Sequence, residues 1–200
     1  MTEMQNVLPR SPPPSADLLS DVLARMHLSG SVLFRAEFRE PWSVTTPASC
    51  DLARLLPFHT ERIIPFHVIA GGGCWLELEG IDPVWLADGD ALVLPYGHPH
   101  GLRGREPAAP PPVGQLLPPP PWDDIPRVDH GGAGPATQLI CGFVQCDELL
   151  CHPVLHRLPP LLHVSPERTP ADRWLASTIR HTAAEASAPS PGSRSMLPRL

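Results

Sequence analysis

The 200-residue sequence lacks any run of about 20 apolar residues, the length that a membrane-spanning helix needs. Its first residues also lack the basic-then-apolar order of a secretory signal peptide. The five cysteines are odd in number and sparse, which argues against the disulfide framework of a secreted protein. We therefore expect a cytoplasmic protein without membrane contact, whose cysteines are reduced thiols or metal ligands.

Positive charge is in deficit. The 15 Lys and Arg residues stand against 21 Asp and Glu residues, which gives a formal net charge of -6. Most DNA-binding domains instead attract phosphates with a positive field. We expect that this chain alone does not bind DNA.

Proline and glycine, in contrast, are plentiful, with 29 and 15 residues. Proline ends helices and glycine weakens them, so these counts argue against a helical bundle and favour short strands joined by turns. A chain of this length holds one domain with its own core. The composition predicts a mainly β domain with helical attachments.

Alternating side chains predict a first strand at residues 31–39 and a last one at residues 138–145. One face of the first strand is formed by Val32, Phe34, Ala36 and Phe38. The polar residues between them face the other way, so we expect this strand to be half-buried. The last strand is expected to close the barrel.

Strands and turns follow one another closely between Ile63 and Gly101. Residues 63–70 are β-branched and apolar, and residues 74–78 alternate after the turn Gly71–Gly73. We expect these two strands to pair as a hairpin within an antiparallel meander. Trp75 and Trp85 fall on neighbouring strands, where we expect cross-strand packing, the alternative being stacking on a ligand.

Two segments depart from the strand pattern. Residues 1–14 have no periodic apolar face, so we expect a flexible N-terminal tail. Residues 103–137 are dense in proline, which cannot donate to a β-ladder. We expect a long Pro-rich loop without strand pairing, the most mobile internal part of the domain.

Helices are predicted at both ends of the domain. A short N-terminal helix begins at Ser15 or Asp17, and two more are expected at residues 152–162 and 170–186. We assign residues 15–150 to the barrel. The C-terminal helices, a dimerisation element and a linker occupy residues 151–200.

The run from Gly89 to His100 is the most informative motif. Gly89 permits the turn into a strand, Pro95 and Gly97 turn the chain out, and His100 is aimed into the mouth of a barrel. This run resembles the second cupin motif, and these four residues fall on its fixed positions.

The first cupin motif is matched only in part. His67 aligns with its first His, Ile69 replaces its second His, and Cys74 lies near the position of its Glu. This departure argues against three-ligand metal chemistry of the usual cupin kind.

A wider pattern over about residues 16–200 is similar to the cupin-like N-terminal domain of AraC-family transcription regulators. Its members, in chain order, are residues 20–23, 41–42, 66–68, 73–75, 95–100, 134–142 and 152–162. The resemblance implies a double-stranded β-helix, or jelly roll, that binds a small-molecule effector and forms a homodimer. In that family two helix-turn-helix units follow, so we expect DNA to be bound only through a C-terminal domain missing from this chain.

We predict that His67, Cys74 and His100, with Cys146 as a further ligand, hold zinc or another transition metal. Imidazole and thiolate suit such a borderline-soft ion. The alternative is that His67 and Cys74 are satisfied interior residues and that His100 only hydrogen-bonds a turn.

A second cluster consists of Cys146, Cys151 and His152, with Cys141 and His156 nearby. Metal or redox sensing is one interpretation, although the spacing matches no common zinc motif. The other is that Cys141 and Cys146 fill the last strand as small apolar residues.

The sequence thus predicts the ligand-sensing and dimerisation domain of an AraC-type regulator, and not an enzyme. The alternative is a metal-dependent cupin enzyme of the dioxygenase or isomerase type, against which the incomplete first motif argues. A third hypothesis is a dimerisation scaffold whose barrel is filled by its own side chains.

Overall fold

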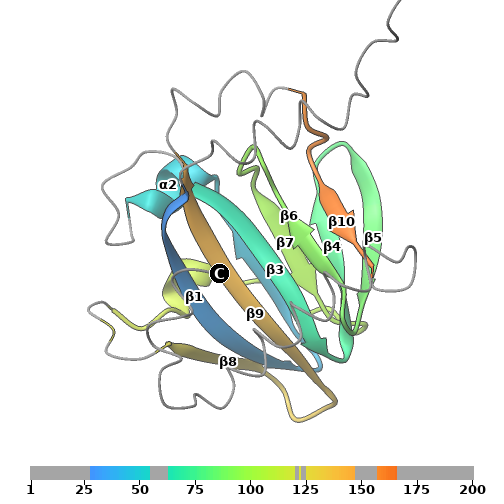
Figure 1. Ribbon diagram of the computed structural model, residues 1–200. Coiled ribbons are helices and arrows are strands. Elements are labelled where there is room, and N and C mark those ends of the chain that lie inside the picture. The colour runs from blue at the N-terminus through green and yellow to red at the C-terminus, as the bar shows by residue number, and fades with distance from the viewer. Residues whose placement is uncertain (1–27, 55–62, 120–121, 123–124, 147–156, 166–200) are drawn as a thin grey trace, which may run out of the picture.

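The computed structural model describes residues 28–54, 63–119, 122, 125–146 and 157–165. Strands dominate these residues (Figure 1). In chain order the elements are β1 (Leu28–Arg39), β2 (Ser43–Thr46), α2 (Ser49–Ala53), β3 (Ile63–Gly71), β4 (Gly73–Leu78), β5 (Ile81–Ala87), β6 (Ala91–Val93), β7 (His100–Arg103), η1 (Val113–Gln115), β8 (Arg127–Gly131), β9 (Ala136–Cys146) and β10 (Leu162–Val164).

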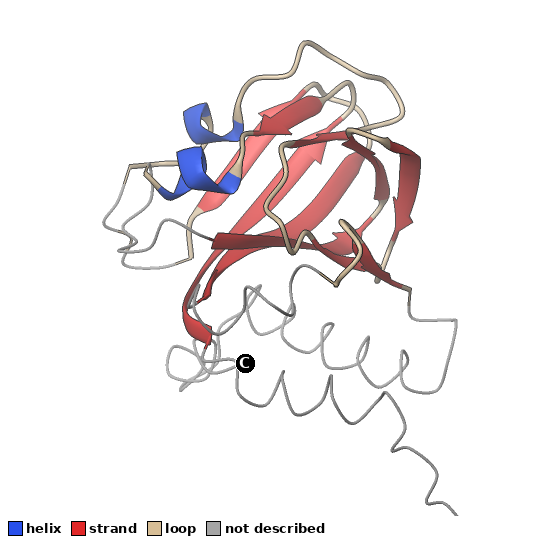
Figure 2. Cartoon of the chain, turned by 90° about the horizontal axis from the view of Figure 1, so that it is seen from above, coloured by secondary structure: helices blue, strands red, loops and turns tan. Residues whose placement is uncertain are grey.

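The strands form two sheets that pack face to face (Figures 1 and 2). The larger has six strands in the order β10-β6-β3-β9-β1-β8, and the smaller has four in the order β2-β7-β4-β5. The core between them combines Phe34 and Phe143 of the larger sheet with Leu76 and Leu102 of the smaller one. The prediction of a mainly β domain is confirmed.

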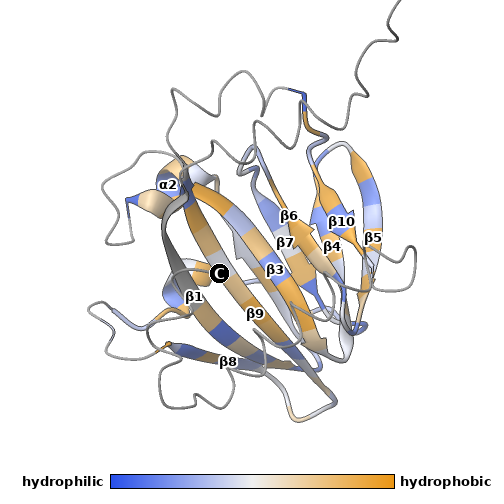
Figure 3. Cartoon of the chain, in the orientation of Figure 1, coloured by the Kyte–Doolittle hydropathy of each residue, from blue (hydrophilic) through white to orange (hydrophobic). Residues whose placement is uncertain are grey.

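Strand β9 is central to the larger sheet, because it pairs antiparallel with β1 on one side and β3 on the other. Apolar colouring extends along both β3 and β9 (Figure 3). The predicted alternation holds: Phe34, Ala36 and Phe38 of β1 are buried, whereas Arg35 and Glu37 between them are partly exposed. The first and last predicted strands are therefore confirmed.

The predicted hairpin of residues 63–70 with 74–78 is wrong. β3 pairs with β6 and β9 in the larger sheet, while β4 pairs with β5 and β7 in the smaller one. Gly72 turns the chain between the sheets with a φ of 80°, and a Cβ there would lie 2.7 Å from the carbonyl oxygen of Ala136. The glycine turn crosses from one layer to the other instead of closing a hairpin.

The expectation that residues 103–137 form no strand pairs is also wrong. β8 lies within this segment and pairs in parallel with β1. Its five residues contain no proline, so each carries the N–H that a ladder needs. Prolines of this segment lack the N–H donor, but their carbonyl oxygens still accept hydrogen bonds. The Thr45 N–H donates to the Pro111 carbonyl oxygen at 3.0 Å, and the Trp122 indole N–H donates to the Pro118 carbonyl oxygen at 2.9 Å.

The helix expected at residues 152–162 is wrong where the structure describes it. Residues 157–161 form turns and bends, and Leu162–Val164 is strand β10, paired with β6. Pro159 and Pro160 explain this, since proline lacks the helical donor and clashes with the preceding turn. The expected tail at 1–14, the helix beginning at Ser15 or Asp17, and the helix at 170–186 lie outside the described residues.

Within the part of the chain that the structure describes, no helix is long and apolar enough to cross a membrane.

Candidate functional site

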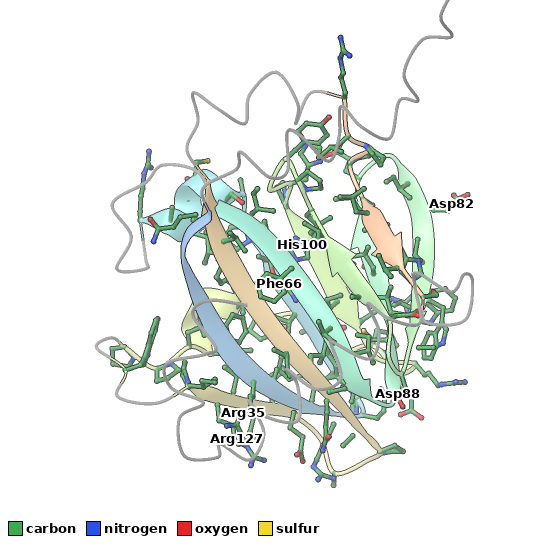
Figure 4. All side chains as sticks on the ribbon, viewed as in Figure 1. Arg35, Phe66, Asp82, Asp88, His100 and Arg127 are labelled. Atoms are coloured by element: carbon green, nitrogen blue, oxygen red, sulfur yellow. The ribbon has the colours of Figure 1, made fainter. Side chains whose placement is uncertain are left out.

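Two histidines meet in the core between the sheets. His67 on β3 is 3% exposed, and His100, the first residue of β7, is 4% exposed. Their Nε2 atoms lie 2.9 Å apart, and their ring planes are inclined at 67°. Figure 4 labels His100 in the space between the two sheets. The two positions that resemble cupin ligands are therefore in direct contact.

The strand period explains the orientation of His67. Along β3, Ile63, His67 and Ile69 are buried, while Phe66 and Val68 between them are partly exposed. Successive side chains of a strand point to opposite faces, so His67 points inward with its apolar neighbours.

The turn before β7 sets the position of His100. Gly97 has a φ of 62°, donates its N–H to the Leu94 oxygen at 2.9 Å and accepts the Ser49 N–H at 3.0 Å. A Cβ at this glycine would clash with the Ser49 hydroxyl at the start of α2. The Gly97 of the motif is thus required both by its backbone conformation and by the close approach of α2.

Cys141 is the third member of the site. It faces His67 across the β3–β9 ladder, and its Sγ lies 2.8 Å from Nδ1 of His67. The sequence predicts Cys146 as the further ligand and groups Cys141 with the second cluster. The alternation of β9, with Leu139, Cys141 and Phe143 buried, could have identified the inward cysteine.

The positions of the hydrogens in this cluster can be assigned by starting from the contact between His100 and the backbone of His98. Nδ1 of His100 lies 3.0 Å from the carbonyl oxygen of His98, which can only accept, so Nδ1 carries the hydrogen. In the neutral ring Nε2 of His100 then accepts, and His67 must donate from its own Nε2. Nδ1 of His67 therefore accepts, and Cys141 donates its S–H. One directed chain of hydrogen bonds runs from Cys141 through His67 and His100 to His98.

Burial keeps every group of this chain neutral. Desolvation lowers the pKa of His67 well below 6.5, and the neighbouring His100 lowers it further. Desolvation also lowers the pKa of His100 to about 4, against a smaller upward effect of its bond to His98. The pKa of the Cys141 thiol is raised well above 9.0 by burial and, secondarily, by Cys74. These directions agree with the tautomers that the hydrogen-bond geometry requires.

Of the other two predicted ligands, Cys74 and Cys146, only Cys74 has a side chain among the described residues. Cys74 on β4 is fully buried beside Leu76 and Leu78, as expected, and burial raises its pKa to about 12. Cys146 ends β9 opposite Leu28, and its side chain is outside the described residues. Residues 147–156, which hold the rest of the second cluster, lie outside them as well.

The fit of a metal can be judged from the donors. Structural zinc sites converge four ligands and catalytic ones three. Among the residues that the structure describes, no group of three or more His, Cys, Asp or Glu side chains has such an arrangement. The Nε2 atoms of His67 and His100 face each other, but the sulfur of Cys141 lies at the opposite nitrogen of the His67 ring. In this arrangement the residues do not fit a zinc ion.

A lumen of only about 10 Å³ lies beside the hydrogen-bonded chain. His67, Cys141 and Thr46 line it together with the apolar side chains of Phe34, Phe38, Val44, Leu102, Val113 and Phe143. That volume is about one water molecule. Val113 of η1, itself 5% exposed, helps to fill the space. The lumen is thus closed by the Pro-rich segment.

Known proteins provide an independent comparison. The sequence profile of a cupin family matches residues 17–200. An AraC-like transcription regulator of Streptomyces lividans is 30% identical over 168 residues, which cover 84% of this chain and 47% of the regulator. The chain therefore spans about half the length of this curated relative.

Two solved structures are also similar. YhaK from Escherichia coli matches 70% of this chain and 48% of its own, with 10% identity and a TM-score of 0.37. ToxT from Vibrio cholerae, in a structure with a bound unsaturated fatty acid, matches 80% of this chain and 49% of its own, with 7% identity and a TM-score of 0.38.

Proposed function

The chain belongs to the cupin family, and on that premise we propose that it is the ligand-sensing domain of an AraC-like transcription regulator. The family match over residues 17–200 confirms the cupin resemblance of the motif at residues 89–100, and the AraC-like relative confirms the resemblance inferred from the wider pattern over about residues 16–200. The relative is named as a regulator, which favours a binding role over catalysis.

One observation carries the proposal: a directed polar chain is buried beside a mainly apolar lumen. Cys141, His67 and His100 satisfy one another, and phenylalanine and leucine side chains surround them. Burying polar groups costs free energy unless they are hydrogen-bonded, so such a chain specifies which partners the lumen accepts. A small, mainly apolar effector with one hydrogen-bonding group matches this lining.

The effector needs space in the lumen that Val113 now occupies. Leu116, Leu117 and Trp122 of the same segment pack against the core beside Val113. An effector that takes the place of Val113 in the lumen would bind the displaced form of the segment better than the form with Val113 inserted. A ligand shifts an equilibrium only through such a difference in affinity, so the segment is our candidate for the element that responds.

The remaining partners belong to the same proposal. A homodimer is the form that the resemblance implies, and a separate domain of the longer protein is proposed to bind DNA. This chain itself carries an excess of acidic residues, with a net charge of -6, which opposes phosphate binding.

A metal-dependent cupin enzyme is less well supported. It needs three or more protein ligands, and the described donors bring two imidazole nitrogens together. Zinc or another transition metal held by His67, Cys74, His100 and Cys146 stays a prediction that elemental analysis tests. Stoichiometric metal in protein purified without added metal, lost in His100→Ala with the fold retained, would establish the site.

A reporter experiment tests the regulatory role. The chain is fused to a DNA-binding domain that represses a reporter only as a dimer, and a leucine-zipper fusion serves as the positive control. We expect repression that depends on the chain, because the proposed domain supplies dimerisation. A fusion that is folded and abundant but silent, beside an active zipper control, would contradict the proposal.

A further inference from the structure

A cavity of about 470 Å³ lies apart from the lumen, where the turns after β1, β3 and β8 meet the segment after β7. Pockets for small molecules commonly have volumes of roughly 300–1,000 Å³. Its chemistry is carried by Glu40, Trp85, Arg105 and Glu106, none of which lines the lumen. The lumen function proposed above uses none of these four residues.

Glycines shape the wall of this cavity. A Cβ on Gly73 would lie 2.5 Å from Cζ2 of Trp85, and a Cβ on Gly134 would lie 2.9 Å from Cβ of Glu40. Both glycines are therefore required by the close approach of a neighbour. The backbone itself forms the wall, so the cavity is built by the fold.

Arg105 offers hydrogen-bond donors to this cavity. Its guanidinium stacks on Trp85 with Cζ 4.7 Å from the ring centroid, and its side chain is exposed. Stacking uses the face of the guanidinium and leaves its N–H groups in the plane available. Among the described residues, no carboxylate or carbonyl accepts from the Arg105 side chain.

Arg103 provides the contrast. Its guanidinium stacks on Trp75 at 5.6 Å, but its Nε donates to Glu77 and its Nη1 donates to the Gly104 oxygen. The two stacks involve neighbouring tryptophans on paired strands, since Trp75 lies opposite Trp85. Only the Arg105 stack keeps its donors for a further partner.

Two carboxylates lie at the same cavity. The Glu40 carboxylate accepts the backbone N–H of Arg105 at 2.7 Å and that of Glu106 at 3.1 Å. These bonds fix the backbone that carries the Arg105 and Glu106 side chains. Each carboxylate oxygen has two acceptor sites, so Glu40 and the exposed Glu106 can still accept from a cation.

We propose that this cavity binds a small zwitterion, an aminocarboxylate of the amino-acid type. The carboxylate pairs with Arg105, the ammonium group is held by Glu40 and Glu106, and the carbon skeleton lies against Trp85. A ligand with only a negative charge would face two carboxylates, and a ligand with only a positive charge would face Arg105. Both charges together match the cavity.

Calorimetric titration of the full chain tests this proposal with matched probes. Glycine and L-phenylalanine are zwitterions, 3-phenylpropionate keeps only the carboxylate, and phenethylamine keeps only the ammonium group. We expect at least one of the two amino acids to bind. L-phenylalanine should bind at least about tenfold more tightly than either singly charged analogue, because each analogue leaves a charged group of the cavity without its partner.

Two substitutions locate the binding. Arg105→Gln should weaken binding of the amino acid by at least about tenfold, the loss expected for a charge-assisted hydrogen bond. Arg103→Gln removes the equivalent stack outside the cavity and should leave binding unchanged. Absence of binding by both amino acids, or equal weakening by the two substitutions in folded protein, would overturn the proposal. Neither result bears on the lumen or on the reporter experiment.

Discussion

His163 and His67 lie in one cross-strand row of the larger sheet, because both pair with Leu92, His163 from β10 and His67 from β3. Nε2 of His163 lies 3.0 Å from Oδ2 of Asp90, which also accepts the Ala87 N–H at 3.0 Å. The edge strand β10 is thus tied to the turn that leads into β6. Through Leu92, this row connects His163 with His67, a member of the hydrogen-bonded chain.

The first prediction concerns this tie. His163→Ala removes the contact with Asp90, and we expect the amides of β10 to exchange with solvent about fivefold faster, as for loss of a hydrogen bond worth about 1 kcal/mol. Hydrogen exchange with mass spectrometry measures the change. Ser165→Ala is the control, since its hydroxyl lies 3.4 Å from His163 and contributes little. Equal exchange in both variants would show that β10 is held by its ladder alone.

The second prediction concerns the histidine pair. His100→Leu leaves the His67 N–H buried without an acceptor, so we expect the free energy of unfolding to fall by about 1–3 kcal/mol. His67→Leu combined with His100→Leu should cost less than the sum of the two single changes, because no ring donor is then orphaned. Urea unfolding of the four proteins measures both quantities. Strictly additive losses would mean that the rings do not depend on each other.

The third prediction is a pH dependence of stability. Burial holds the pKa of His67 well below 6.5 and that of His100 at about 4, so both rings are neutral in the folded chain. As pH falls below 6.5 the unfolded chain binds protons that the folded chain does not, and the free energy of unfolding decreases. The contribution of His100 ends near pH 4, below its folded pKa. Denaturant unfolding at a series of pH values between 6.5 and 4 measures the free energy of unfolding at each pH. This free energy should change less with pH in the double leucine variant than in the native chain.

The fourth prediction compares two glycines with positive φ. Gly97→Ala meets both an unfavourable φ of 62° and the Ser49 hydroxyl. Gly80 has a φ of 79°, and nothing lies within 4 Å of the Cβ that Gly80→Ala adds. This substitution should therefore lower the free energy of unfolding only by the cost of the left-handed conformation, roughly 1–2 kcal/mol. We expect Gly97→Ala to cost more than Gly80→Ala in chemical denaturation. The reverse order would mean that α2 moves away from the new Cβ at no cost in the free energy of unfolding.

The fifth prediction concerns the closure of the lumen. Val113→Gly removes the buried side chain that fills the space beside Cys141. We expect alkylation of Cys141 to become about tenfold faster, since burial of such a side chain stabilises the closed segment by roughly 1.5–3 kcal/mol. Peptide mapping follows the labelling, with exposed Cys50 as the internal reference whose rate should stay constant. An unchanged alkylation rate at Cys141 would mean that Val113 does not close the lumen.

The sequence predicted features that depend on local periodicity. The alternation of β1, the inward position of Cys74 and the turn at Gly97 each follow from a few neighbouring residues, and the structure agrees with them. The cross-strand pair of Trp75 and Trp85 was predicted as packing, and their rings lie 5.3 Å apart. One strand period and one turn suffice for such inferences.

Features that depend on distant pairing were not predicted. Periodicity cannot show whether Gly71–Gly73 closes a hairpin or carries the chain to the other sheet, because both need the same glycines. The alternation of β9 separates the inward Cys141 from Cys146, but the pairing of Cys141 with His67 depends on the register of β9 against β3, which no local pattern contains. The parallel pairing of β8 with β1 was hidden by the prolines around it.

The central position of β9 has a consequence for synthesis of the chain. Phe34 of β1 pairs with Cys141 of β9 across roughly a hundred residues, and such non-local pairing slows folding. As the polypeptide leaves the ribosome, β1 and β3 emerge long before the strand that joins them. Until β9 follows, both expose unpaired backbone groups that favour aggregation. A premature stop before Ala136 would therefore remove the middle of the sheet, leaving edges that another nascent chain could occupy.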